Sequence, residues 1–278
     1  MQLTQMRLRI KAIETIKKIT NAMRLISMSM HMRLNHKIPL MQNYKKELLY
    51  ILNILQSHSS DIKTDNILNP PTGTPEKILI IIVGSQKGLS GTFNSSLFRF
   101  FEKHESFENA SFIAVGKKSV DYIKKHSEVT QGYNVFNFQN LDKITREIYN
   151  IIMQADPIYT NVFCYSNYSK GFLTQLPHKT ALIPLQLDNE AQKFTPQEDY
   201  LWPQDPNKIL DTLTKEYLKL TLQTILFESL IAEQAARFQS MDNATRNANE
   251  LLENMTRQYN KLRQTKITKE ISEISSSL

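Results

Sequence analysis

From residue 207 to residue 275, apolar residues recur at alternating steps of three and four. This row consists of Leu210, Leu213, Tyr217, Leu220, Thr224, Phe227, Ile231, Gln234, Phe238, Met241, Thr245, Ala248, Leu252, Met255, Tyr259 and Leu262. It spans about eight heptads with mostly apolar a and d positions, which predicts one long coiled-coil helix. Neither Gly nor Pro occurs after Pro206 to interrupt it. At about 1.5 Å per residue the helix is on the order of 100 Å long, so it needs a partner helix.

A second long helix is predicted at the start of the chain, where residues 1–38 again contain neither Gly nor Pro. Its heptad row is Met6, Ile13, Thr20, Ser27 and Leu34, and Ile16, Met23 and Met30 lie beside that row. Pro39 is expected to kink this helix, because residues 44–55 read as helical again. The two helices pair most simply as an antiparallel coiled coil, with Ile16 and Met23 packed against residues 237–262.

The middle of the chain follows a different pattern, and all seven glycines lie in it. After a polar, Pro-containing loop at residues 56–76, strands are predicted at 77–83, 111–115 and 159–165, with a possible strand at 129–138. Helices are predicted at 94–104, 117–126 and 141–155, followed by an extended segment at 172–187 and a connecting loop at 188–206. The alternation predicts an at least partly parallel α/β sheet. Asp205 or Asn207 is the expected N-cap of the last helix, with Pro206 in its first turn.

These patterns predict a mixed α/β fold, in which a long antiparallel coiled coil accompanies a central Rossmann-like α/β domain. The expected divisions are an N-terminal coiled-coil helix at 1–58, the α/β domain at 76–206 and a C-terminal coiled-coil helix at 207–278. No apolar run approaches the roughly 20 residues of a membrane span. The single cysteine, Cys164, excludes a disulfide framework and fits a reducing compartment.

The basic charge of the chain is concentrated at its start. Residues 1–50 contain ten Lys or Arg and two acids, a net charge of +8, against +7 for the whole chain. From residue 207 onward, ten basic residues face nine acidic ones, so the C-terminal helix is nearly balanced. A basic helix indicates an acidic partner, which could be nucleic acid, anionic lipid or an acidic protein loop, or else a solvated face.

Catalytic signatures are missing from the sequence. Gly84, Gly88 and Gly91 follow the first strand, but their spacing is neither GxGxxG nor a P-loop, and a structural turn is the simpler interpretation. The six histidines have no metal-ligand spacing, and the acids of the middle are dispersed. We therefore predict no catalytic residue, no bound cofactor and no metal ligand.

Three segments resemble the gamma subunit of the F-type ATP synthase. Residues 9–28 (RIKAIETIKKITNAMRLISM) are similar to its N-terminal KIT-x-AM signature. Residues 84–94 (GSQKGLSGTFN) look like its central S-D-R-G-L-C-G-G-x-N turn, with Gln86, Lys87, Ser90 and Thr92 departing from that pattern. The most specific match is residues 232–274, which resemble EQAARMxAMxxATxNA followed by YNxxRQxxITxEIxEI.

The resemblance implies a non-catalytic shaft that turns inside a hexamer of α and β subunits and couples rotation of the membrane c-ring to ATP synthesis on β. It implies one copy per complex, contacts with the epsilon subunit and the c-ring, no bound nucleic acid, and a peripheral position at the cytoplasmic face of the bacterial inner membrane. The matching interface positions are Lys18, Thr20, Met23, Arg24, Lys87, Arg237, Arg263, Gln264 and Thr268. The alternatives are a basic-helix nucleic-acid-binding or coiled-coil scaffold protein, and a small-molecule enzyme built on the α/β domain.

Overall fold

The computed structural model describes residues 3–58, 77–185 and 203–276. The chain divides into two compact units: unit 1 is Met1–Met30 with Arg237–Leu278, and unit 2 is His31–Ala236. Two long helices, α1 (Leu3–Asn35) and α6 (Pro206–Ser276), contribute residues to both units. The connecting loops predicted at 56–76 and 188–206 fall largely outside the described residues.

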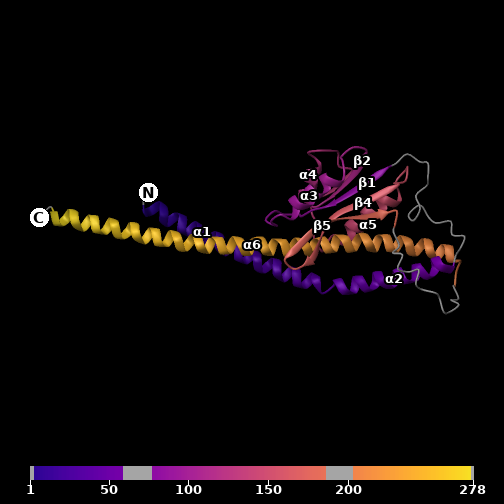
Figure 1. Ribbon diagram of the computed structural model, residues 1–278, viewed down its shortest axis with the longest axis horizontal. Coiled ribbons are helices and arrows are strands. Elements are labelled where there is room, and N and C mark those ends of the chain that lie inside the picture. The colour runs from indigo at the N-terminus through magenta and orange to yellow at the C-terminus, as the bar shows by residue number, and fades with distance from the viewer. Residues whose placement is uncertain (1–2, 59–76, 186–202, 277–278) are drawn as a thin grey trace. The chain divides into compact units, whose positions relative to one another are not determined.

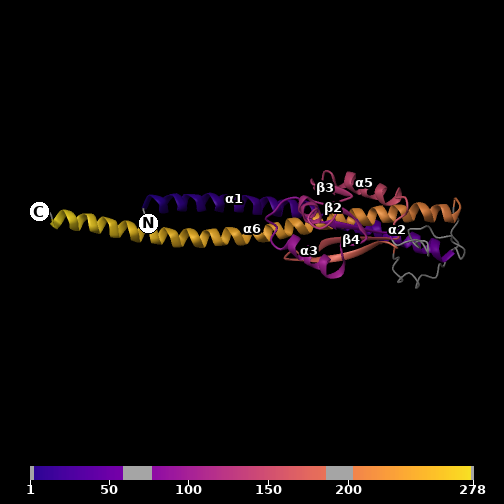
Figure 2. The same ribbon diagram turned by 90° about the horizontal axis from the view of Figure 1, so that it is seen from above.

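Unit 1 consists of helix alone. Figures 1 and 2 both show α1 and α6 side by side and running in opposite directions within it. The long terminal helices and their antiparallel pairing are therefore confirmed. The predicted start of α6 also holds, because the Asp205 side chain accepts a hydrogen bond from the Asn207 N–H at 3.0 Å and its carbonyl accepts from Lys208. Asp205 is thus the N-cap, and Pro206 occupies the first helical position, where its missing N–H costs nothing.

The chain breaks near Pro39 instead of kinking. Helix α1 ends at Asn35, and α2 (Ile38–His58) begins after a short turn in which the Lys37 N–H donates to the Leu34 carbonyl at 2.9 Å. In an unbroken helix the ring of Pro39 would clash with the carbonyl of residue 35, four positions earlier. Placing Pro39 in the first turn of a new helix avoids that clash.

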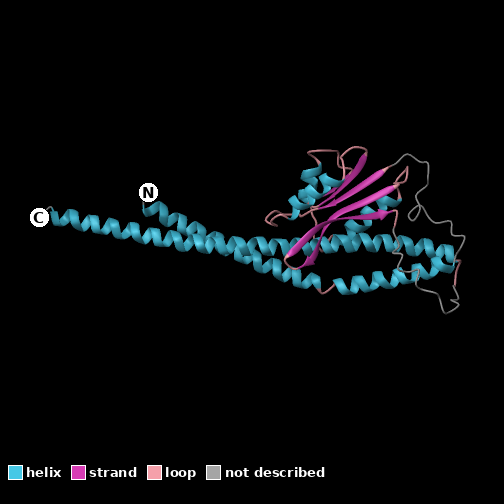
Figure 3. Ribbon diagram, in the orientation of Figure 1, coloured by secondary structure: helices cyan, strands magenta, loops and turns pink. Residues whose placement is uncertain are grey.

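Unit 2 contains a five-stranded sheet in the order β3-β2-β1-β4-β5 (Figure 3). Strands β1 (Ile78–Val83), β2 (Ala110–Val115), β3 (Gln131–Tyr133) and β4 (Asn161–Gly171) are mutually parallel. The edge strand β5 (Thr174–Ile183) is antiparallel to β4 and forms a hairpin with it. The chain leaves β1 first toward β2 and later toward β4, so the point where the strand order reverses lies between β1 and β4.

Helices cover both faces of this sheet, as expected for a mostly parallel sheet. Helices α3 (Phe93–His104) and α4 (Lys117–Ile123) pack on one face, where Ile80 and Ile82 point. Helix α5 (Leu141–Met153) packs on the other, where a larger apolar core also takes in side chains of α2 and α6. Burial of the β-strand side chains on both faces explains the continuous apolar run that marks β1 in the sequence.

The Rossmann-like domain is confirmed, with three differences in its elements. Strand β3 has three residues, shorter than the predicted 129–138, and Val135 beyond it is 52% exposed. Helix α4 ends at Ile123, because the next bonds skip three residues instead of four: the Lys125 N–H donates to the Tyr122 carbonyl at 3.2 Å and the His126 N–H to the Ile123 carbonyl at 2.9 Å. Strand β4 runs to Gly171, well past the predicted end at 165, since its hairpin with β5 extends the pairing.

Candidate functional site

The inner seam of unit 1 is formed by the predicted heptad rows. On α1, Met6 and Ser27 are buried at 3% and 1% exposure. On α6, Met241, Thr245 and Ala248 are buried at steps of four and three. Most of these side chains are small or unbranched, and small seam residues allow two helices to approach closely. The seam therefore makes a thin helix pair.

Two polar contacts fix the register of the pair. The Thr245 hydroxyl donates to the Thr20 hydroxyl at 2.9 Å, and the Arg24 guanidinium lies 2.7 Å from the Asp242 carboxylate. The partner number falls as the α1 number rises, which is the antiparallel arrangement. Polar groups at seam positions select one register because any slip leaves them unpaired.

Asp242 also accepts from Arg246, one turn later on α6, at 2.6 Å. The hydrogen bond from Arg24 is the main cause that lowers the pKa of Asp242 below its usual range, and Arg246 adds to it. The carboxylate thus stays ionised between two guanidinium groups. Asp242 was absent from the predicted interface set; the one sequence signal for it was an acid at the edge of an otherwise apolar seam.

The outward face of α1 is also apolar, and here one prediction was wrong. Ile16 was expected to pack against α6, yet it is 53% exposed. It belongs to a row with Leu8, Ile19, Ile26 and Met30, whose exposed fractions run from 37% to 64%. A helix with apolar rows on two faces gives no internal signal for which row turns inward. We name these five residues the outer apolar row.

The predicted interface residues of α1 divide between seam and surface. Thr20 and Arg24 make the register contacts described above, and Met23 is half-buried beside them. Lys18 is exposed. The structure therefore brings two of the four into contact with α6 and leaves one fully available to another molecule.

The last turns of α6 are exposed on every side. All described residues from 260 to 276 are exposed, among them the predicted Arg263, Gln264 and Thr268. Ile267 and Ile271 are 46% and 61% exposed on this stretch. Helical order there is supported by ion pairs at spacing four, such as Lys266–Glu270 at 3.6 Å, which contribute a few tenths of a kcal/mol each. By contrast Arg237, also predicted as an interface residue, is 8% exposed.

In unit 2 the loop after β1 occupies the point where the strand order reverses. The Asn94 side chain accepts from the Ser85 N–H at 2.9 Å and donates to the Ser85 hydroxyl at 2.8 Å. The Asn167 side chain on β4 donates to the Phe93 carbonyl at 3.0 Å. In open α/β sheets this crevice is where nucleotides bind, through free backbone N–H groups. Here the Asn94 side chain already accepts from one such group, the Ser85 N–H, and Lys87, the predicted contact residue, is exposed on the loop.

Close packing explains the glycine that opens this loop. A side chain at Gly84 would place its Cβ 2.4 Å from the Ser119 hydroxyl. Gly116, at the end of β2, has φ of +86°, and a Cβ there would lie 2.3 Å from the Gly84 carbonyl. The ends of β1 and β2 and the start of α4 therefore approach too closely for a side chain at either glycine.

Residues 3–58, 77–185 and 203–276 contain no candidate metal centre, since no group of three or more His, Cys, Asp or Glu residues is placed there to hold a metal ion. No helix in those ranges is long and apolar enough to cross a membrane.

These features define the class: one chain that contains a helix pair with an exposed apolar flank and an α/β domain whose loop after β1 is tied by Asn94 and Asn167. Comparison with known proteins agrees. The family description "ATP synthase" matches residues 2–278. The chain is 31% identical to the ATP synthase gamma chain of Chlorobium chlorochromatii, covering 98% of this chain and 96% of that one. It is 32% identical to the gamma chain of Clostridium perfringens, covering 98% and 95%.

Solved structures share the fold. A chain in the Euglena gracilis mitochondrial ATP synthase (OSCP/F1/c-ring, rotational state 3) aligns over 99% of this chain and 93% of its own length, with a TM-score of 0.67 and 14% identity. A chain in the central stalk/c-ring structure of the Tetrahymena thermophila mitochondrial ATP synthase aligns over 81% and 99%, with a TM-score of 0.56 and 19% identity. The chain belongs to the family of ATP synthase gamma chains.

Proposed function

We propose that this chain is the central rotary shaft of an F-type ATP synthase, coupling rotation of the membrane c-ring to conformational change at the catalytic β subunits. The observation that carries the proposal is the helix pair of unit 1. Its seam is closed by apolar and paired polar contacts, while the outer apolar row and the end of α6 remain exposed. Apolar rows left uncovered on a folded chain indicate surfaces that meet other proteins.

The chain itself is proposed to be non-catalytic, with ATP chemistry performed by β. In support, the Asn94 side chain binds both the N–H and the hydroxyl of Ser85 in the loop after β1, and the one thiol of the chain is buried. Cys164 is buried, and that burial raises the pKa of its thiol to about 12. A thiol is a nucleophile only as the thiolate, so Cys164 is a poor candidate for catalysis.

The proposed partners are the hexamer of α and β subunits around unit 1, and the epsilon subunit and c-ring at the α/β domain, with one copy of this chain per complex. The proposed interface residues are Lys18, Thr20, Met23, Arg24, Lys87, Arg237, Arg263, Gln264 and Thr268. Thr20 and Arg24 would act by holding the register of the pair, since α6 already occupies their polar groups. The exposed lysines of α1 would face acidic loops of the β subunits.

Three functional segments are proposed: helix 1–58, α/β domain 76–206 and helix 207–278. The complex is proposed to sit peripherally at the cytoplasmic face of a bacterial inner membrane, with no nucleic acid bound. The nucleic-acid-binding and scaffold alternatives receive no support from the relatives and structures named above. A basic helix alone, without a recognition motif, does not favour them.

Disulfide trapping tests the shaft directly. Thr268→Cys places a thiol on the exposed end of α6, and a cysteine introduced in the facing loop of a β subunit provides its partner. Buried Cys164 contributes no competing reaction. Oxidation should crosslink this chain to one β subunit and stop ATP turnover, and reduction should restore it. Continued turnover in the crosslinked complex would refute rotation of this helix, and failure to co-purify α and β with the chain would refute the assignment.

A further inference from the structure

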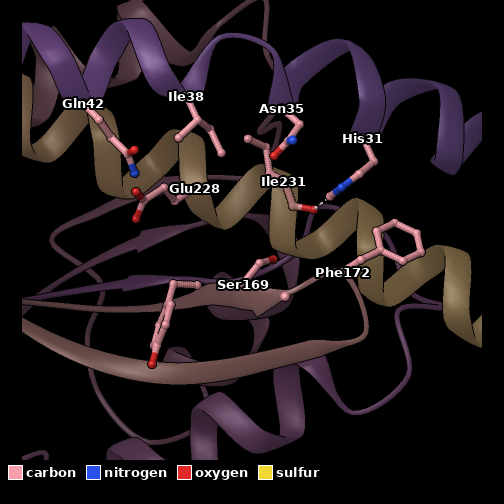
Figure 4. Close-up of a pocket in the computed structure, with 10 residues that line it drawn as sticks. His31, Asn35, Ile38, Gln42, Ser169, Phe172, Glu228 and Ile231 are labelled. Atoms are coloured by element: carbon pink, nitrogen blue, oxygen red, sulfur yellow. Dashed lines mark hydrogen bonds between the residues drawn. The ribbon is translucent and has the colours of Figure 1, made fainter.

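Unit 2 contains a cavity of about 370 Å³ that the shaft function does not use. It lies where the α1–α2 turn, the β4–β5 hairpin and the middle of α6 meet (Figure 4). Its volume falls at the lower end of the range of roughly 300–1,000 Å³ found for small-molecule sites. The cavity therefore has room for a compact ligand.

One carboxylate dominates the chemistry of this cavity. Among the described residues that line it, Glu228 of α6 alone has a full formal charge when histidine is neutral. Its carboxylate interacts with the Gln42 amide of α2, which also lines the cavity. An anionic ligand would be repelled here, whereas a cation or a donor-rich neutral molecule would be attracted.

Basic groups of the protein also face this carboxylate. Lys45 on α2 and His178 on β5, together with Gln42, favour its ionised form, whereas burial raises the pKa of Glu228 above its usual range. Neither Lys45 nor His178 is among the residues that line the cavity, so a ligand cation would approach Glu228 from the cavity side.

A second polar group, on the strand side, also points to a ligand. The Ser169 hydroxyl of β4 is buried and has no hydrogen-bond partner among the described residues. Figure 4 shows Ser169 on the strand and Glu228 on the helix, on two sides of the cavity. An unpaired buried hydroxyl costs free energy, so a ligand that donates to or accepts from Ser169 would recover that cost.

Apolar side chains form the other end. The Phe172 ring meets the His31 ring edge-on, with centroids 4.8 Å apart, and the His31 Nδ1 lies 3.4 Å from the Ile231 carbonyl. Ile38 adds to this apolar wall. The site thus pairs a carboxylate with a short apolar wall, which suits a charged head on a small alkyl body.

We propose that this cavity binds a small organic cation, an alkylammonium whose head group contacts Glu228 and whose alkyl body lies along Phe172 and Ile38. A bound ligand would bridge α2, α6 and the β4–β5 hairpin, since each contributes a wall. It would therefore stabilise their mutual packing by mass action.

Calorimetric titration of the full-length chain with n-butylammonium tests this site at physiological salt. Saturable binding is expected, with no binding of neutral 1-butanol, which has a similar length. The net charge of +7 disfavours loose association of a cation elsewhere on the chain. Absence of saturable butylammonium binding, or equal binding of the alcohol, would overturn the proposal.

Variants locate the binding. Glu228→Gln removes the charge with little change in shape and should weaken butylammonium binding about tenfold or more, as loss of a charge-assisted hydrogen bond predicts. Glu250→Gln, an exposed acid on the same helix, is the matched control and should bind as the native chain does. Ser169→Leu fills the cavity from the strand side and decides the matter if Glu228→Gln does not fold. Native binding in either cavity variant would overturn the proposal.

Discussion

The contact between the first residue of α3 and α6 can be tested by removing the Phe93 ring. Phe93 is 4% exposed and forms a small apolar cluster with Ala232 and Ala236 of α6. Truncating a buried Phe to Ala costs about 3–5 kcal/mol when the surroundings do not collapse. At about 2–4 °C per kcal/mol for a domain of 150–250 residues, Phe93→Ala should lower the Tm of unit 2 by roughly 6–20 °C. Calorimetry of the isolated chain measures this.

A control lies on the loop just before α3. Leu89 is 58% exposed, so Leu89→Ala should change the free energy of unfolding by no more than about 0.5 kcal/mol. Phe93→Leu retains most of the side-chain volume and should cost under about 1.5 kcal/mol. If Phe93→Ala unfolds at the same temperature as Leu89→Ala, the cluster does not anchor the start of α3 to α6 and the reasoning fails.

Three further variants test unit 1. Asp242→Asn should lower the free energy of unfolding at neutral pH. The pKa of Asp242 is lowered in the folded state, so the carboxylate stabilises the fold above its unfolded-state pKa, and this contribution is lost as the pH falls through its folded-state pKa. In acid titrations the stabilities of the native and variant chains should therefore converge. Replacing Arg263 and Gln264 together by Ala should change the free energy of unfolding by no more than about 1 kcal/mol, because both side chains are exposed, yet it should lower coupled ATP synthesis. A much larger change in the free energy of unfolding would contradict the interface role. The third variant replaces three lysines of α1 by glutamine: Lys11, Lys17 and Lys18. The variant should be at least as stable as the native chain in isolation, and it should assemble with α and β less well at raised salt. If it assembles normally at all salt concentrations, these lysines only face solvent.

Local patterns predicted most of the fold. The heptad rows of both long helices and the apolar run of β1 depend on spacing along the chain, so the sequence alone predicted them. The sequence also predicted the Asp205 N-cap, because its hydrogen-bond partners lie within four residues. Long-range pairing was less accessible: the extension of β4 beyond Tyr165 depends on its hairpin partner β5.

The candidate site was harder to predict where burial depends on another element. Ile16 and Thr20 lie one helical turn apart, and hydrophobicity alone favours the isoleucine for the inner seam. The structure turns Thr20 inward, because its hydroxyl meets Thr245, and leaves Ile16 outside. The cavity beside Glu228 was likewise invisible in the sequence, since residues from α1, α2, β4 and α6 meet there.

The two long helices differ in mechanical continuity. Helix α6 runs from Pro206 to Ser276 with no interior Gly or Pro, so each turn is tied to the next by backbone hydrogen bonds. The N-terminal helical segment is instead interrupted at His36 and Lys37, between α1 and α2. Under a twisting load a hydrogen-bonded helix resists and a turn yields. Elastic energy would therefore be stored chiefly in α6, while the α1–α2 turn acts as a compliant joint that lets the two helices accommodate unequal rotation.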